Sequence, residues 1–133
     1  MLQVRSWIKI ADNTGVKIAN IFGGSGKNRS RFVRIGDVVS ASAKAVAPNG
    51  NYKKGDKIKV AIVRTRKEVR RKDGSYIRFD DNAGVLVKKD AKGRYEIIGT
   101  RIFGPIPREV RDMATGYYED AYKKIVSLAP EVI

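Results

Sequence analysis

Apolar and polar residues alternate along most of the first hundred positions, and this period of two predicts β-strands. A first strand is expected over residues 2–10, with an apolar parity formed by Leu2, Val4, Ile8 and Ile10. A second is expected over 16–22, with inward positions at Val16, Ile18 and Phe22. The pattern predicts further strands over 39–45, 58–62 and 95–98. The continuous apolar run 83–87 predicts a strand covered on both faces.

The strand expected over 39–45 has small residues on its inward parity, namely Val39, Ala41, Ala43 and Ala45. Side chains of this size allow another strand to approach closely, as inside a narrow barrel. The opposite parity is polar, with Ser40, Ser42 and Lys44. Runs of Asp, Asn, Gly and Pro separate the strands and predict turns. The sequence therefore predicts a mainly β fold.

A basic hairpin is predicted over about residues 63–82. Its first half carries six cations in nine positions, Arg64, Arg66, Lys67, Arg70, Arg71 and Lys72. Asp73-Gly74 is a turn sequence, because glycine adopts positive φ without steric cost, and Tyr76 to Phe79 alternate as a returning strand would. Such a hairpin cannot bury its own charge, so it indicates an anionic partner such as a polyphosphate. The alternative is a solvated basic loop that serves only solubility.

The charge of the chain is unevenly distributed. The 28 basic and 14 acidic residues give a net charge of +14, but residues 1–108 carry +16 and residues 109–133 carry −2. Because the basic excess extends beyond the hairpin, it favours nucleic acid as the partner of the body. The acidic segment is expected to avoid RNA.

The residues after 106 predict helices. Pro107 suits a first helical turn, Glu109 lies near the positive end of the helix dipole, and Gly116 would end that helix. A second helix is expected before Pro130, with an apolar face at Tyr118, Ala121, Tyr122, Ile125 and Leu128. We expect this face to close one side of the barrel. A single domain is expected over 1–133, with the barrel and hairpin in 1–106 and a helical tail in 107–133.

The chain lacks the residues that most catalytic and metal sites need. It contains no cysteine and no histidine, which removes thiolate ligands, disulfides and imidazole bases. The glycine-rich run from Gly23 to Asn28 is not a Walker loop, because Ile21 stands where its first glycine belongs and Asn28 replaces Ser or Thr. An enzyme, a cofactor and a metal site are therefore not expected.

No apolar run approaches membrane-spanning length, and the first ten residues lack the apolar core of a signal peptide. We therefore expect no membrane partner and no export. The expected location is the cytoplasm or an organelle matrix.

The cations expected to contact RNA lie in the hairpin, in the glycine-rich loop and in the segment 44–54. They are Lys27, Arg29, Arg31, Lys44, Lys53, Lys54, Arg64, Arg66, Lys67, Arg70, Arg71, Lys72 and Arg78. Trp7 and Tyr76 occupy outward positions and could stack on bases, but they lie in separate segments and form no paired aromatic motif. Recognition of RNA shape and phosphates is therefore favoured over base readout. A freestanding barrel that binds single-stranded RNA is the alternative.

Four segments resemble the universal large-subunit ribosomal protein fourteen family in its bacterial form. They are residues 11–15, 63–86, 98–105 and 125–133. The spacing of Asp73-Gly74, Phe79, Asn82 and Val85-Leu86 matches the signature region of that family. The resemblance covers nearly the whole chain in order, although the region between Arg111 and Lys124 is several residues longer here.

This resemblance implies a five-stranded β-barrel with a projecting hairpin and small C-terminal helices. It also implies a structural role in the large ribosomal subunit, with direct binding to large-subunit rRNA and inter-subunit bridges to small-subunit rRNA. The implied protein neighbours are large-subunit proteins three and nineteen, together with the ribosome silencing factor, which blocks subunit joining. The residues that match the docking site of that factor are Thr100, Arg101 and Lys124.

Overall fold

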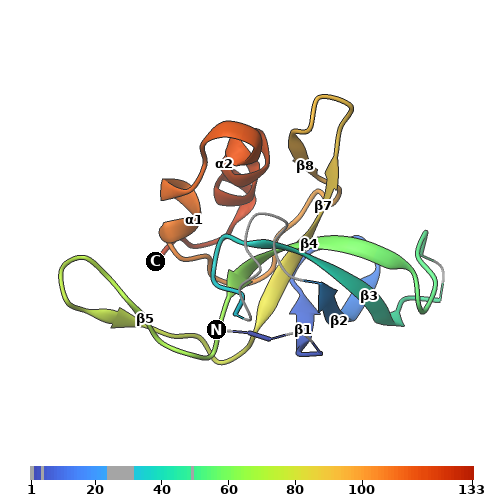
Figure 1. The fold of residues 1–133 in the computed structure, drawn as a ribbon, viewed down its shortest axis with the longest axis horizontal. Helices are drawn as coiled ribbons and strands as arrows, with labels where there is room; N and C mark the ends of the chain where they lie inside the picture. The colour runs from blue at the N-terminus through green and yellow to red at the C-terminus, as the bar shows by residue number, and fades with distance from the viewer. Residues whose placement is uncertain (1, 4, 24–31, 49) are drawn as a thin grey trace.

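The computed structural model describes residues 2–3, 5–23, 32–48 and 50–133. Six strands form the main sheet: β1 (Trp7–Ile10), β2 (Val16–Gly23), β3 (Val38–Val46), β4 (Lys57–Arg64), β7 (Ala83–Lys89) and β8 (Tyr95–Ile97). Two short strands, β5 (Val69–Arg70) and β6 (Tyr76–Ile77), form a separate hairpin. The tail contains α1 (Glu109–Asp112), a 3-10 turn (Gly116–Tyr118) and α2 (Glu119–Leu128). Figure 1 shows the tail helices beside β8 and the β5–β6 hairpin extending away from the body.

The main sheet closes into a five-stranded barrel. Strands β1, β2, β3, β4 and β7 pair in that order with antiparallel neighbours. Closure comes from a parallel pairing of β1 with β7, in which Lys9 lies opposite Ala83. The predicted barrel with small helices after it is therefore confirmed.

Small residues fill the barrel interior, as their positions in the sequence predict. Ala19, Ala41 and Ala43 are completely buried, and they belong to one apolar cluster with Val60 and Leu86. Gly84 lies where β7 crosses this cluster, and a Cβ there would overlap Cγ1 of Val60. The narrow interior thus requires residues without bulk from several strands.

The outer face of the sheet is divided into a covered half and an open half. On β4, Ala61 and Val63 are buried in a second apolar cluster, whereas Lys57 and Lys59 on the same parity are exposed. The neighbouring strands change in the same way, from Val38 to Ser40 on β3 and from Val87 to Lys89 on β7. The tail covers the apolar half, since Ala121, Tyr122 and Ile125 of α2 belong to the second cluster.

The first two strands differ from the simple alternation. The first strand begins only at Trp7, because Arg5 adopts φ +76° and turns the chain. Val4 lies outside the described residues. In β2, register shifts around Ile18 move Ala19 and Ile21 into the core. The prediction that Phe22 faces inward is therefore wrong, and its side chain is 48% exposed.

The tail also differs from the expected helices in two places. Its first helix ends at Asp112, and Gly116 begins the 3-10 turn instead of ending a helix. Leu128 at the end of α2 is 38% exposed, so the buried stripe stops at Ile125. Tyr122 anchors the stripe, because its buried hydroxyl donates a hydrogen bond to the carbonyl of Gly36. The tail thus joins the body through apolar packing and this bond.

Candidate nucleic-acid interface

The hairpin has the predicted turn. Gly74 adopts φ +89°, and Asp73 Oδ1 accepts hydrogen bonds from the backbone nitrogen of Ser75 at 2.9 Å and from its hydroxyl at 2.6 Å. These bonds hold the pKa of Asp73 below its usual value. The turn is therefore fixed by an Asx-type network as well as by the glycine.

Most hairpin cations point into solvent. The exposed members are Arg66, Lys67, Arg70, Lys72 and Arg78. The acidic residue Glu68 lies between these cations in the sequence, and its Oε1 is 3.5 Å from Nζ of Lys67. Its pKa is lowered, first by a backbone hydrogen bond and then by that lysine, so it stays charged and offsets one cation. The remaining cations form a positive surface that can bind phosphates.

Arg64 differs from the other predicted contacts because it is buried. Its Nε lies 3.0 Å from Oδ1 of Asp81, and its Nη1 donates to the carbonyl of Phe103 at 2.8 Å. Gly104 lies so close that a Cβ there would overlap Nη1 of Arg64. The guanidinium therefore joins the base of the hairpin to the segment after β8, and its charge is already paired.

Arg71 also has a partner inside the protein. Its Nε donates to Oε1 of Glu109 at 2.7 Å, and its Nη2 donates to the backbone oxygen of Ile133 at 2.7 Å. Ile133 in turn donates its amide to the carbonyl of Ile106 at 2.9 Å. This arginine thus fastens the hairpin to the tail, and it leaves the neighbouring Arg70 and Lys72 exposed.

The remaining predicted contacts lie apart from the hairpin. Lys53 and Lys54 are exposed on the turn before β4, and Lys44 is half-buried on β3. The hairpin follows the other end of β4, which at about 3.3 Å per residue places the two groups roughly 25 Å apart. Lys27, Arg29 and Arg31 lie outside the described residues. The structure therefore presents two separate basic regions.

Two predicted stacking residues are well exposed but do not meet. Trp7 on β1 is 61% exposed, and Tyr76 on β6 is 64% exposed. They belong to different sheets, in agreement with the interpretation that they form no paired aromatic platform.

Asn13 holds the segment that contains Thr100 and Arg101. Its Oδ1 accepts hydrogen bonds from the amides of Thr100 at 2.8 Å and Arg101 at 3.2 Å, and its Nδ2 donates to the hydroxyl of Thr100 at 2.8 Å. Lys124 is exposed on α2. Arg101 and Lys124 each precede a member of the second apolar cluster, Ile102 and Ile125 respectively.

Asp12 is a buried carboxylate in a segment whose composition predicts a turn. Its Oδ2 accepts from the amide of Leu86 at 2.9 Å, and its Oδ1 accepts from the amide and hydroxyl of Thr14. Burial raises the pKa of this carboxyl, although its hydrogen bonds oppose the shift. The signal in the sequence was the Asp-x-Thr spacing, which favours an Asx turn, but the contact with β7 depends on barrel closure.

The described residues contain no group of three acidic side chains that could hold a metal ion. None of the helices described is long and apolar enough to cross a membrane. Within the described residues, the candidate site is a surface of exposed cations on the β5–β6 hairpin.

Taken together, the closed barrel, the projecting basic hairpin and the packed helical tail define a small basic β-barrel protein with an exposed cationic surface. Comparison with known protein families matches residues 1–133 to Ribosomal protein L14p/L23e. The chain belongs to this family, whose members are structural proteins of the large ribosomal subunit.

Proposed function

We propose that this protein binds large-subunit rRNA directly through the exposed cations of the hairpin. The observation that carries the proposal is the contrast between neighbouring cations in residues 70–72: Arg71 is bonded to Glu109, while Arg70 and Lys72 on either side remain exposed. A hairpin that is held at its base by Arg64 and beside its turn by Arg71 loses little conformational entropy when it binds, which favours affinity. Binding near the subunit interface would also let the exposed hairpin contribute to inter-subunit bridges with small-subunit rRNA.

The test is the salt dependence of binding to a structured large-subunit rRNA fragment. If the five exposed hairpin cations each neutralise a phosphate, the slope of log affinity against log salt should be about −4 to −5. Changing Arg70→Gln with Lys72→Gln should flatten this slope by about two units. A matched control changes Lys17→Gln with Lys92→Gln, two exposed lysines outside the predicted contacts. A slope that the hairpin variant leaves unchanged would exclude the hairpin as the RNA contact.

A second proposed role is protein docking at the segment 100–101. Asn13 accepts hydrogen bonds from the amides of Thr100 and Arg101 and donates one to the Thr100 hydroxyl, which suits a preformed docking surface. The expected partner is the ribosome silencing factor, and neighbouring contacts with large-subunit proteins three and nineteen are expected within the assembled subunit.

Arg101→Glu with Lys124→Glu should abolish binding of the silencing factor in a pull-down with purified large subunits. Both side chains are exposed, so the melting temperature and the rRNA affinity should barely change. Survival of factor binding in this double variant, or collapse of rRNA affinity, would show that the docking surface lies elsewhere.

A further inference from the structure

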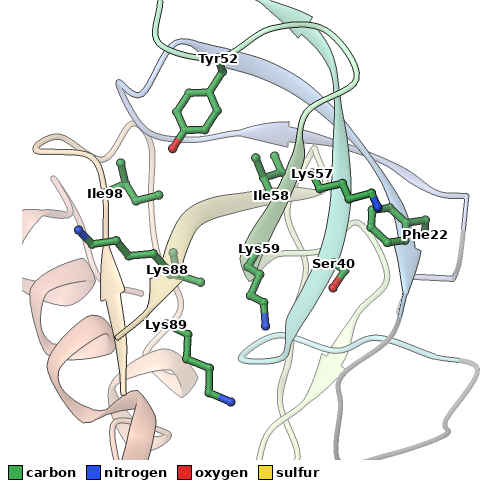
Figure 2. Close-up of a pocket in the computed structure, with 10 residues that line it drawn as sticks. Phe22, Ser40, Tyr52, Lys57, Ile58, Lys59, Lys88, Lys89 and Ile98 are labelled. Carbon is green, nitrogen blue, oxygen red and sulfur yellow. The ribbon is translucent and has the colours of Figure 1, made fainter. Parts of the chain in front are cut away.

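The open half of the outer sheet face contains a groove of about 540 Å³. It lies at the start of β4 and the end of β7, and the hairpin follows the opposite end of β4. A row of paired positions crosses it, from Ser40 on β3 to Lys59 on β4 and then to Val87 on β7. Figure 2 shows Phe22 at one side of the groove and Ile98 with Lys88 at the other, with Lys59 between them.

The groove is strongly positive. Its lining includes Lys57, Lys59, Lys88 and Lys89, and no carboxylate lines it among the described residues. None of these four ammonium groups takes part in an ion pair within the described part of the chain, although Lys89 lies 6.0 Å from the ring centre of Tyr95. The uncompensated charge is complementary to a polyanion.

The groove is also apolar between these charges. Ile58 and Val87 are buried within it, while Phe22 is 48% and Ile98 is 38% exposed. A duplex offers phosphates but keeps its bases stacked inside, so it would leave these apolar side chains uncovered. A single strand offers both phosphates and unstacked bases, and bases stack on exposed aromatic rings.

We propose that this groove binds a single-stranded segment of RNA, with an unpaired base stacked on Phe22 and the flanking phosphates on the lysines. The proposal rests on the proposed RNA-binding function, but it assigns a second site roughly the length of β4 away from the hairpin. Ser40 and Tyr52 contribute hydroxyls and the other groups are lysines or apolar, so the groove accepts different bases without strong sequence preference. An acidic peptide with an apolar side chain is the competing occupant.

The stacking step is tested with a short fluorescein-labelled oligouridylate and the full chain, by fluorescence anisotropy. Phe22→Ala should lower the affinity by roughly 5- to 100-fold, the usual effect of removing one stacking ring. Phe22→Tyr keeps a ring and should restore most of the affinity. Tyr117→Ala, which removes an exposed aromatic outside the groove, should change nothing. Unchanged affinity in Phe22→Ala would overturn the proposal.

The phosphate contacts are tested by salt titration with the same oligouridylate. Lys59→Gln and Lys88→Gln should each flatten the salt slope by about 0.7, the value for one phosphate of a single strand. Lys92→Gln, on the exposed turn outside the groove, is the matched control. Equal salt slopes for the groove and control variants would contradict the assignment. It would also be contradicted if an acidic leucine-containing peptide bound more tightly than the oligouridylate and Phe22→Ala removed that binding.

The structured rRNA fragment separates this proposal from the hairpin function. Arg70→Gln with Lys72→Gln should weaken binding of that fragment more than binding of the oligouridylate, and Phe22→Ala should do the reverse. If the rRNA fragment binds normally and Phe22→Ala leaves the affinity for the oligouridylate unchanged, only the groove proposal fails. If the fragment does not bind the native chain at all, the rRNA-binding function itself fails.

Discussion

Arg71 and Glu109 join the hairpin to the first tail helix, with Nε of the arginine 2.7 Å from Oε1 of the glutamate. Both side chains are largely shielded from water, at 12% and 24% exposure. A pair in such surroundings leaves an unsatisfied charge when one partner is removed. The ion pair therefore fastens the hairpin, beside its turn, to the first tail helix.

Glu109→Gln should therefore lower the free energy of unfolding by about 1–3 kcal/mol, because Arg71 loses a charged acceptor in a partly buried place. Urea denaturation of Glu109→Gln, Arg71→Gln and the double variant measures the coupling between the two side chains. The exposed pair of Lys123 and Glu119 is the control, and breaking it should leave the midpoint unchanged. If the effects of Glu109→Gln and Arg71→Gln on the free energy of unfolding are additive, the predicted coupling is contradicted.

Gly74→Val should strain the hairpin turn without disturbing the barrel. A Cβ at Gly74 meets nothing within 4 Å, so the cost arises only from φ +89°, and about 1–2 kcal/mol is expected. We expect the melting temperature to fall by only a few degrees, because the strain is confined to the hairpin, and the binding to the rRNA fragment to weaken. Gly74→Asn, which tolerates the left-handed region, should keep the affinity. A large drop in melting temperature would instead make the hairpin part of the core structure.

The raised pKa of Asp12 should be visible in the pH dependence of the unfolding free energy. Because burial raises the pKa of this carboxyl above its ordinary 3.8, the folded chain holds the proton more tightly than the unfolded chain. Each increase in pH from about that value through the raised pKa therefore favours unfolding at this site. The difference in unfolding free energy between the native protein and Asp12→Asn should fall across this window.

Asp73→Asn provides the opposite control for that experiment. The pKa of Asp73 is lowered by its bonds to Ser75, so its contribution to stability is present at neutral pH and is lost as pH falls.

Asp12→Asn should also be less stable at every pH by about 1–3 kcal/mol, since its amide cannot accept from both Leu86 and Thr14. Parallel pH curves for the native protein and Asp12→Asn would rule out the raised pKa.

Two residues of α2 should respond very differently to truncation. Ile125 is completely buried against the body, so Ile125→Ala should cost about 2–5 kcal/mol. Leu128 is 38% exposed, and Leu128→Ala should cost about 0.5 kcal/mol or less. Urea denaturation compares the two directly. A similar loss in both would show that the helix packs along its full apolar stripe.

The sequence predicted those parts of the fold in which residue parity alone decides burial. Ala41 and Ala43 of β3 and the covered run in β7 lie as expected, since a barrel interior selects small residues and a strand between two layers must be apolar on both sides, whereas Ala45 near the end of β3 is only half-buried. Phe22 was misplaced because register shifts in β2 change the parity after Ile18. Such bulges leave no mark in an apolar pattern, since Ile21 and Phe22 are equally hydrophobic.

The sequence predicted that the candidate interface is a basic hairpin, but it did not predict which cations are exposed and which are paired within the protein. Arg64 continues the alternation of Ile58, Val60 and Ile62, but a register shift after Ile62 places it opposite Ala83 of the second apolar cluster, so parity alone does not give its position. The pairing of Arg71 does not follow from parity either, because its partner Glu109 lies 38 positions later and only the docking of the tail brings them together. Counting charges therefore located the surface, while the pairing of individual charges required the tertiary structure.

The parallel pairing of β1 with β7 also governs how the molecule can form. Asp12 meets the amide of Leu86 across 74 positions of the chain, and β1 stays without its second neighbour until β7 has been made. Contacts over such separations must overcome loop-closure entropy before they stabilise anything, and this slows folding. During synthesis the strands β1 to β4 can pair as an open meander, but the cylinder closes only after the ribosome has released residues beyond the hairpin.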